Sequence, residues 1–124
     1  MNLCKVQGIT VSVTMALKLN NLLNAAKADG ITMSGWGYRS YERQKELRIE
    51  HGCPDFSKPS STCSPPTARP GESNHESGEA VDFTYGGSTL TRGSAAFRWM
   101  TQKAGAFGFI NLPSEAWHWS KDGG

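Results

Sequence analysis

Ser73-Asn74-His75-Glu76-Ser77-Gly78-Glu79-Ala80-Val81-Asp82-Phe83 joins a histidine, a glycine and a short strand in one stretch of the chain. Successive side chains of a strand point to opposite faces, so Asp82 should face away from Val81 and Phe83. The two apolar neighbours can then enter a core while the carboxylate reaches a pocket. An unpaired carboxylate in such a strand is costly, which indicates that Asp82 has a partner.

A second cluster, Glu115-Ala116-Trp117-His118-Trp119, lies later in the sequence. With the first stretch it supplies His75, Asp82 and His118 as possible metal ligands. Two imidazoles and one carboxylate, with a fourth position left to water, are typical of a catalytic zinc site. The HExxH motif of many zinc peptidases is absent, so such a site would be assembled from distant parts of the chain.

Amide hydrolysis at such a site needs groups beyond the ligands. Glu115, three residues before His118, is a possible general base. Arg39, just past a predicted strand, could stabilise developing negative charge or bind a substrate carboxylate. The other candidates for substrate binding are Gln44, Ser73 and Trp117.

The composition of the 124 residues is that of one globular domain, residues 1–124, with 37% hydrophobic and 19% charged residues. No apolar run approaches the roughly 20 residues that a membrane span needs. The net charge of +2 is small and its Lys and Arg residues are scattered, which argues against nucleic-acid binding. A monomer is expected.

Hydrophobic periodicity predicts an α+β fold, with helices packed on a small antiparallel sheet. Residues 6–13 are expected to be a loop or a short strand before the first helix. The expected helices cover residues 16–26, 41–51 and 94–104, and the expected strands cover residues 31–36, 80–83, 107–110 and 116–119.

The second predicted helix, residues 41–51, is highly charged and should be capped by Ser40. His51 lies at its end, where a cation interacts well with the helix dipole. Ion pairs are expected along its exposed face. The residues expected to form them are Glu42, Lys45, Glu46 and Arg48.

Cys53 and Cys63 bracket a loop rich in Pro and Ser. A disulfide between them would restrict the unfolded chain by about 2–3 kcal/mol, whereas two free thiols are the alternative in a reducing compartment. Cys4 is left over and is expected to be a small buried hydrophobe. The long loop at 53–73 is expected to form an ordered rim of the site.

Four motifs resemble the VanY-type D-alanyl-D-alanine carboxypeptidases, which belong to a group of zinc peptidases that includes lysostaphin-like enzymes and the hedgehog domain. The motifs are Gly37-Tyr38-Arg39-Ser40-Tyr41-x-x-Gln44, Pro70-Gly71-x-Ser73-x-His75-x-x-Gly78-x-Ala80-Val81-Asp82-Phe83, Phe107-Gly108-Phe109 and Glu115-x-Trp117-His118-Trp119. They occur in order over nearly the whole chain.

The resemblance implies one zinc ion bound by His75, Asp82 and His118, with Glu115 as base and Arg39 as the transition-state cation. It implies a peptidoglycan stem peptide as substrate. Removal of a terminal D-alanine is the favoured reaction, with cleavage between L-alanine and D-glutamate, as in phage endolysins, as the alternative. A third possibility is a non-catalytic cell-wall or metal-binding module, although such a module would not need Glu115.

No signal peptide is visible at the N-terminus. The protein is therefore expected to reach the bacterial cell wall as a phage endolysin, or as a domain cut from a longer secreted protein.

Overall fold

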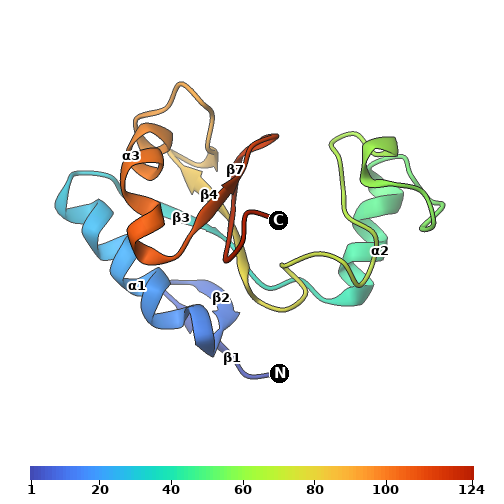
Figure 1. Cartoon of the computed structure of the whole chain (residues 1–124), viewed down its shortest axis with the longest axis horizontal. Helices are drawn as coiled ribbons and strands as arrows, with labels where there is room; N and C mark the ends of the chain where they lie inside the picture. Colours follow the sequence, from blue (N-terminus) through green and yellow to red (C-terminus); the bar gives the residue numbers. More distant parts are fainter.

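An antiparallel sheet forms the centre of the computed structural model, which describes all 124 residues (Figure 1). Its neighbouring strands follow the order β3-β4-β7-β6, and the short β5 pairs with β4. This arrangement confirms the predicted α+β class. The strands are β3 (Met33–Trp36), β4 (Ala80–Tyr85), β5 (Ser88–Thr89), β6 (Ile110–Leu112) and β7 (Glu115–Ser120).

Helices α1 (Val13–Ala28) and α3 (Ala95–Lys103) lie beside the sheet and provide much of the hydrophobic core (Figure 1). Val81 and Phe83 of β4 are fully buried in this core, while Asp82 between them is only partly buried. The alternation predicted for β4 is therefore present. Burying each large apolar side chain contributes about 1.5–3 kcal/mol, so this face anchors the strand that carries Asp82.

The short strand expected before the first helix is present as β2 (Ile9–Ser12), but the sequence did not predict that it is one arm of a hairpin. Strand β1 (Leu3–Val6) pairs with β2 (Ile9–Ser12). Gln7 and Gly8 form the turn, with φ of 48° and 86°. A two-residue turn with positive φ at both positions favours Asn-Gly or Asp-Gly, and Gln-Gly is a weaker signal.

The strand predicted at residues 107–110 begins later than expected. Residues Ala104–Phe107 continue α3 as the 3-10 helix η2, which ends where Gly108 takes a left-handed φ of 82°. Extended backbone resumes at Ile110, the first residue of β6. Glycine tolerates the left-handed region without steric cost, so this glycine marks the end of a helix rather than the interior of a strand.

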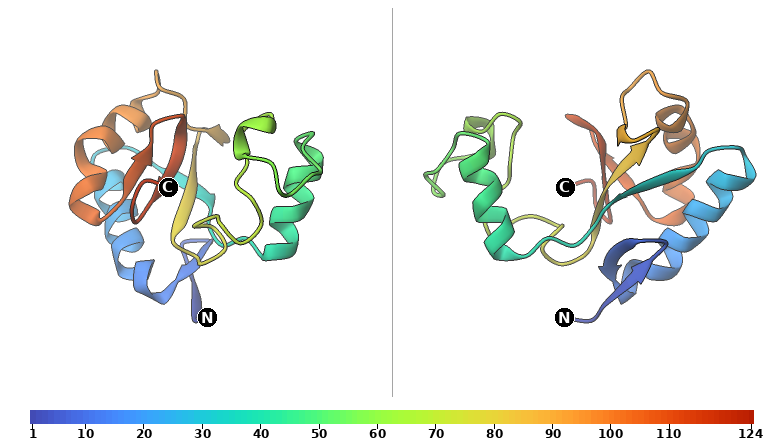
Figure 2. Two further views of the ribbon diagram at one scale, coloured as in Figure 1. Left: turned by 45° about the vertical axis from the view of Figure 1, so that its right-hand side comes forward. Right: turned by 180° about the vertical axis from the view of Figure 1, so that it is seen from behind.

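Helix α2 (Tyr41–Glu50) and residues 53–70 form a second lobe that stands apart from the sheet (Figure 2). Ser40 caps the helix as predicted, by accepting a hydrogen bond from the Arg43 N–H. The loop includes the short 3-10 helix η1 (Ser60–Thr62). A disulfide joins Cys53 to Cys63, whereas Cys4 is free and half-buried against the core.

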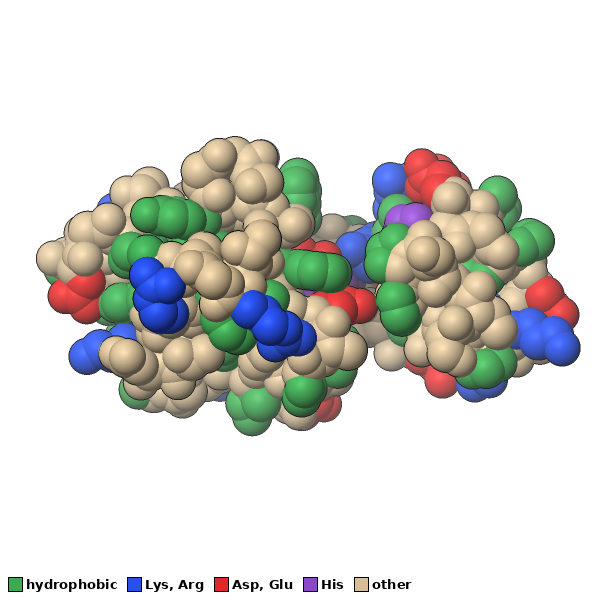
Figure 3. Space-filling model, turned by 90° about the horizontal axis from the view of Figure 1, so that it is seen from above, with side chains coloured by type: hydrophobic (Ala, Val, Ile, Leu, Met, Phe, Trp, Pro, Cys, Tyr) green, Lys and Arg blue, Asp and Glu red, His purple; other side chains and the backbone are tan.

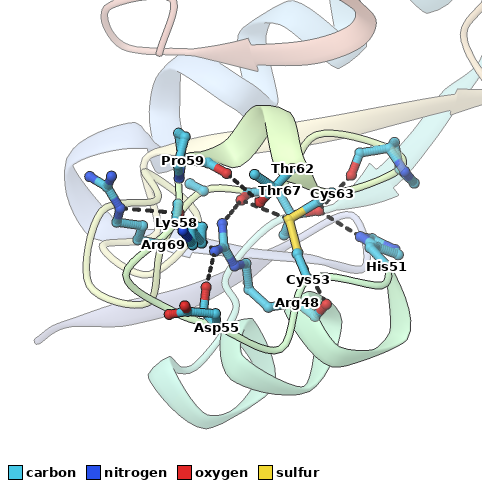
Figure 4. The surroundings of a disulfide bond; sticks show 12 residues. Arg48, His51, Cys53, Asp55, Lys58, Pro59, Thr62, Cys63, Thr67 and Arg69 are labelled. Carbon is cyan, nitrogen blue, oxygen red and sulfur yellow. Dashed lines mark hydrogen bonds between the residues drawn. A yellow bond between two sulfur atoms is a disulfide. The ribbon is translucent and has the colours of Figure 1, made fainter.

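Arg48 is fully buried inside this lobe, so the prediction that it forms an ion pair on the exposed face of α2 was wrong. Its guanidinium donates hydrogen bonds of 2.8 Å to the carbonyl oxygens of Asp55, Lys58 and Thr67 (Figure 4). His51, the C-cap of the helix, brings its Nδ1 to 2.6 Å from the Thr67 hydroxyl. The lobe is thus held by a buried cation that binds loop carbonyls, in addition to the disulfide.

One ion pair predicted on the exposed face of α2 is present, because Lys45 pairs with Glu42. Glu46 instead lies within 4 Å of Arg43, which also pairs with Glu50. None of the helices combines the length and the apolar character that crossing a bilayer requires.

Candidate metal centre

Asp82 and His118 are register partners on the neighbouring strands β4 and β7, and therefore lie side by side. His75 reaches them from the turn that precedes β4. Its Nε2 is 3.0 Å from Asp82 Oδ1, and His118 Nδ1 is also 3.0 Å from that oxygen. One donor atom from each side chain lies within 4.8 Å of the others, as the sequence predicted for metal ligands.

The remaining nitrogen of each ring faces a main-chain oxygen. His75 Nδ1 donates to Gly37 O, and His118 Nε2 donates to Gly124 O, both at 2.7 Å. In a neutral imidazole the nitrogen opposite the N–H carries a lone pair. Two lone pairs and a carboxylate oxygen thus converge, which is unfavourable unless protons or a cation lie between them.

This donor set fits zinc. Zinc bonds to nitrogen and oxygen of about 2.0–2.2 Å in a tetrahedral site place neighbouring donors roughly 3.3 Å apart, close to the two 3.0 Å separations from Asp82 Oδ1. The two imidazole nitrogens lie within 4.8 Å of one another. Metal-binding histidines are fixed in tautomer and ring orientation when the nitrogen that faces away from the metal donates to a carbonyl or carboxylate oxygen. Both His75 and His118 have such a bond.

Asp82 on β4 and His118 on β7 shift each other's pKa. Burial alone would raise the pKa of Asp82, but hydrogen bonds and charge from His118 and His75 hold it well below its ordinary value. Burial likewise opposes protonation of His118, yet Asp82 outweighs it and raises the pKa of that imidazole. In the metal-free protein the cluster therefore favours an imidazolium beside a carboxylate, and a metal must compete with that proton.

Glu115, the candidate base, opens β7 and lines the same hollow as the three donors. Its carboxylate makes no hydrogen bond or ion pair with another side chain. Burial raises its pKa, and the charge of Asp82 adds to this effect while His118 and Arg39 oppose it. A carboxylate whose pKa lies closer to neutral is a better proton acceptor and donor in hydrolysis.

Arg39 approaches the cluster from the segment between β3 and α2. Its guanidinium lies 3.5 Å from Asp82 Oδ2 and donates a 3.0 Å hydrogen bond to Gln44 Oε1. Burial lowers the pKa of Arg39, partly offset by Asp82. Gln44 is itself buried and donates to Ala68 O at 2.8 Å, so both ends of its amide are engaged. In this structure Gln44 holds Arg39 against the second lobe, and its predicted contact with substrate stays a prediction.

All the predicted site residues other than the cysteines line one hollow between the sheet and the second lobe (Figure 3). The expected rim is there too, since residues 60, 65–68 and 72–74 form part of its wall. The predicted site residues in this hollow are Arg39, Gln44, Ser73, His75, Asp82, Glu115, Trp117 and His118.

Sequence reasoning missed residues that shape the segments around these side chains. The Glu76 carboxylate accepts hydrogen bonds from the backbone N–H groups of Gly71 and Ser73, at 2.8–3.0 Å. These hydrogen bonds hold the backbone of residues 71–73, which leads to His75. Because its partners are backbone groups, the sequence carries no pairing signal for Glu76.

Comparison with known proteins gives a consistent result. The sequence model of the VanY D-alanyl-D-alanine carboxypeptidase family matches residues 8–121. No relative was found among curated protein sequences.

Several solved structures share the fold. A variant of the vancomycin-resistance D,D-pentapeptidase VanY in complex with Zn(II) is 28% identical, with a TM-score of 0.76 over 97% of this chain and 78% of that one. VanYB in complex with D-alanine-D-alanine is also 28% identical, with a TM-score of 0.77 over 97% and 76%. The LD-carboxypeptidase LdcB is 27% identical, with a TM-score of 0.72 over 90% and 58%.

Proposed function

Because the chain belongs to the VanY family of D-alanyl-D-alanine carboxypeptidases, we propose that it removes the terminal D-alanine from peptidoglycan stem peptides with one bound zinc ion. The observation that carries this proposal is the meeting of His75, Asp82 and His118 beside the unpaired carboxylate of Glu115 in one hollow. The zinc and D-alanyl-D-alanine complexes of the VanY structures support the choice of metal and substrate.

His75, Asp82 and His118 would hold the zinc ion, which would supply a water of pKa about 7 and polarise the scissile carbonyl. Glu115 then acts as the general base. Its carboxylate accepts the proton of the attacking water and delivers it to the amide nitrogen of the leaving D-alanine. Its raised pKa supports both halves of this transfer.

Arg39 supplies a fixed positive charge at the side of Asp82. Such a group stabilises the negative charge that develops on the carbonyl oxygen, or binds the terminal carboxylate of the substrate through its two-pronged guanidinium. Gln44 holds this arginine in place. The hydroxyl oxygen of Ser73 accepts a 3.2 Å hydrogen bond from the backbone N–H of His75. Its O–H can therefore still donate to the substrate.

A second candidate is cleavage of an L,D rather than a D,D bond. Two solved structures favour it, those of LdcB and of the L,D-carboxypeptidase DacB from Streptococcus pneumoniae. The DacB structure is 25% identical, with a TM-score of 0.65 over 91% of this chain and 68% of that one. Both reactions need the same metal site, so the residues that line the rest of the hollow determine which bond is cut.

The test uses purified stem pentapeptide and tetrapeptide, with the products read by mass spectrometry. Loss of one alanine from the pentapeptide alone supports the D,D activity, and loss of one alanine from the tetrapeptide supports the L,D activity. A new amino terminus on D-glutamate would instead support the endopeptidase. A protein that binds wall fragments but leaves them uncut would be a binding module.

Glu115→Ala is expected to lower kcat by roughly 10²–10⁴-fold, because the proton acceptor is lost. Zinc content, measured by atomic absorption, should stay at the parental value because Glu115 is not a ligand. Glu42→Ala, which removes an exposed carboxylate from α2, is the matched control and should keep parental kcat. Parental turnover by the Glu115 variant would exclude this role.

The site of action is the bacterial cell wall, and delivery as a phage endolysin is the finer proposal. The small positive charge would draw the protein weakly to an anionic polymer such as the cell wall. Lysis of intact cells by protein added from outside would support the endolysin. Hydrolysis restricted to isolated stem peptides would oppose it.

A further inference from the structure

The relative placement of Glu115 and His118 is unusual for a strand. The two residues are three positions apart on β7, and an odd separation on a regular strand puts side chains on opposite faces. Both nevertheless line the same hollow. Some departure from regular strand geometry must therefore turn one of them.

The pairing of β7 with β6 shows that departure. Asn111 is the register partner of Trp119, and the next residue, Leu112, is the partner of Glu115. One step along β6 thus corresponds to four along β7, so residues 116–118 bulge away from β6. On the other side of β7, His118 stays in register with Asp82. Bulges of this kind re-aim side chains, and they are frequent beside active sites.

The side chain of Asn111 closes this bulge. Its Nδ2 donates hydrogen bonds of 3.0 Å to the backbone oxygens of both Glu115 and His118. A carboxamide NH₂ group has two hydrogens, and here each has one acceptor. A single half-buried side chain therefore bridges the peptide groups of the proposed base and of a proposed metal ligand.

We propose that Asn111 is a positioning residue that sets the distance between the base Glu115 and the metal held by His118. This inference rests on the proposed function and adds a residue to it. Only a side chain with two adjacent donors can satisfy both carbonyls. Aspartate at this position has the same shape but would place an acceptor against two acceptors.

The experiment compares Asn111→Ala with the parental enzyme, both loaded with zinc for kinetics and with Co²⁺ for visible spectra. Loss of an outer contact to a metal site typically costs about 10–100-fold in activity or metal affinity. We expect kcat to fall within that range with little change in KM, and the cobalt spectrum to shift. Asn111→Asp should be at least as impaired, and Asn111→Gln, which keeps the donors, should recover part of kcat.

A double-mutant cycle with Glu115→Ala separates positioning from general destabilisation. If Asn111 acts by placing the base, Asn111→Ala should lower kcat much less in the Glu115→Ala background than in the parental one. Asn24→Ala, an exposed asparagine of α1 that bonds Gln7, is the matched control and should leave kcat and the cobalt spectrum unchanged.

Parental kcat together with a parental cobalt spectrum in the folded Asn111→Ala variant would overturn the inference, as would full additivity with Glu115→Ala. An inactive parental protein would instead count against the proposed function. The cobalt spectrum would then decide the inference alone, an unchanged spectrum in Asn111→Ala refuting it and a shifted one supporting it.

Discussion

At the scale of single residues, the chemistry depends on where each polar atom finds its partner. His75 and His118 each use one nitrogen to bind a main-chain oxygen and turn the other toward Asp82. Glu115 lies beside them with no side-chain partner. The proposed mechanism therefore assigns His75, His118 and Asp82 to a shared cation, and Glu115 to proton transfer.

The metal-free protein is expected to lose stability as the pH rises from about 6 to 8. The folded pKa of His118 lies above its ordinary value of 6.5, so its pairing with Asp82 stabilises fully below 6.5 and is lost as the pH passes the folded pKa. Saturating zinc should reverse this trend, because the metal binds neutral imidazole. Thermal unfolding at both pH values, with chelator or with zinc, measures the effect.

The control for this pH dependence is a pair of histidine variants. His118→Gln should flatten the metal-free response, whereas His51→Gln, outside the cluster, should preserve it. An equal slope in His118→Gln and in the parental protein would contradict the assignment.

At the scale of elements, periodicity in the sequence predicts most of what is seen. Strand β4, helix α3 and the cap Ser40 follow from local pattern, because each signal lies within one turn or a few alternating residues. The bulge of β7 does not, because it exists only in the register with β6. The candidate ligands could be predicted from residue type, whereas the contacts that orient them, such as Gly37 O and Asn111, depend on tertiary pairing.

The burial of Arg48 shows the same limit. Its helical position suggested an exposed ion pair, yet the lobe folds over it and offers carbonyl oxygens. The nearest signal in the sequence is the loop of prolines and small residues that follows, since such a loop has few apolar side chains with which to form a core.

Arg48→Ala is expected to lower the free energy of unfolding by about 3 kcal/mol, because three loop carbonyls lose a buried, charged donor. Arg43→Ala on the same helix removes an exposed ion pair and should change it by less than about 1 kcal/mol. Urea unfolding measures both variants, and limited proteolysis should cut the Arg48 variant first within residues 53–70. Similar values for the two variants would show that the lobe does not depend on its buried cation.

At the scale of the whole molecule, the sheet with its helices and the second lobe stand apart as two parts (Figure 2). The hollow is lined by residues of both parts. The sheet and its helices carry Asp82, Glu115 and His118, while the second lobe supports Arg39 through Gln44. The metal would join the turn before β4 to two strands and so add to the stability of the larger part alone.

Removal of zinc is expected to abolish hydrolysis and to lower Tm, with both restored by adding zinc back. A ligand at one hundred times its Kd stabilises the folded state by about 2.7 kcal/mol. Calorimetry and product release are followed in parallel during a chelator titration, and light scattering tests the expected monomer. Full turnover after exhaustive chelation would contradict a zinc mechanism, and a dimer would contradict the monomer.

The N-terminal hairpin bonds to two backbone segments near His75, one at Gly37 and Tyr38 and the other at Gly78. Thr10 O accepts the Tyr38 N–H at 2.6 Å, and the Ser12 N–H donates to Gly78 O at 2.8 Å. A Cβ at Gly37 would collide with the Thr10 carbonyl, so these backbones pass as closely as glycine allows. A dozen residues that contribute nothing to the reaction thus act as a brace for it, and a fragment without them would keep the chemical groups but lose their alignment.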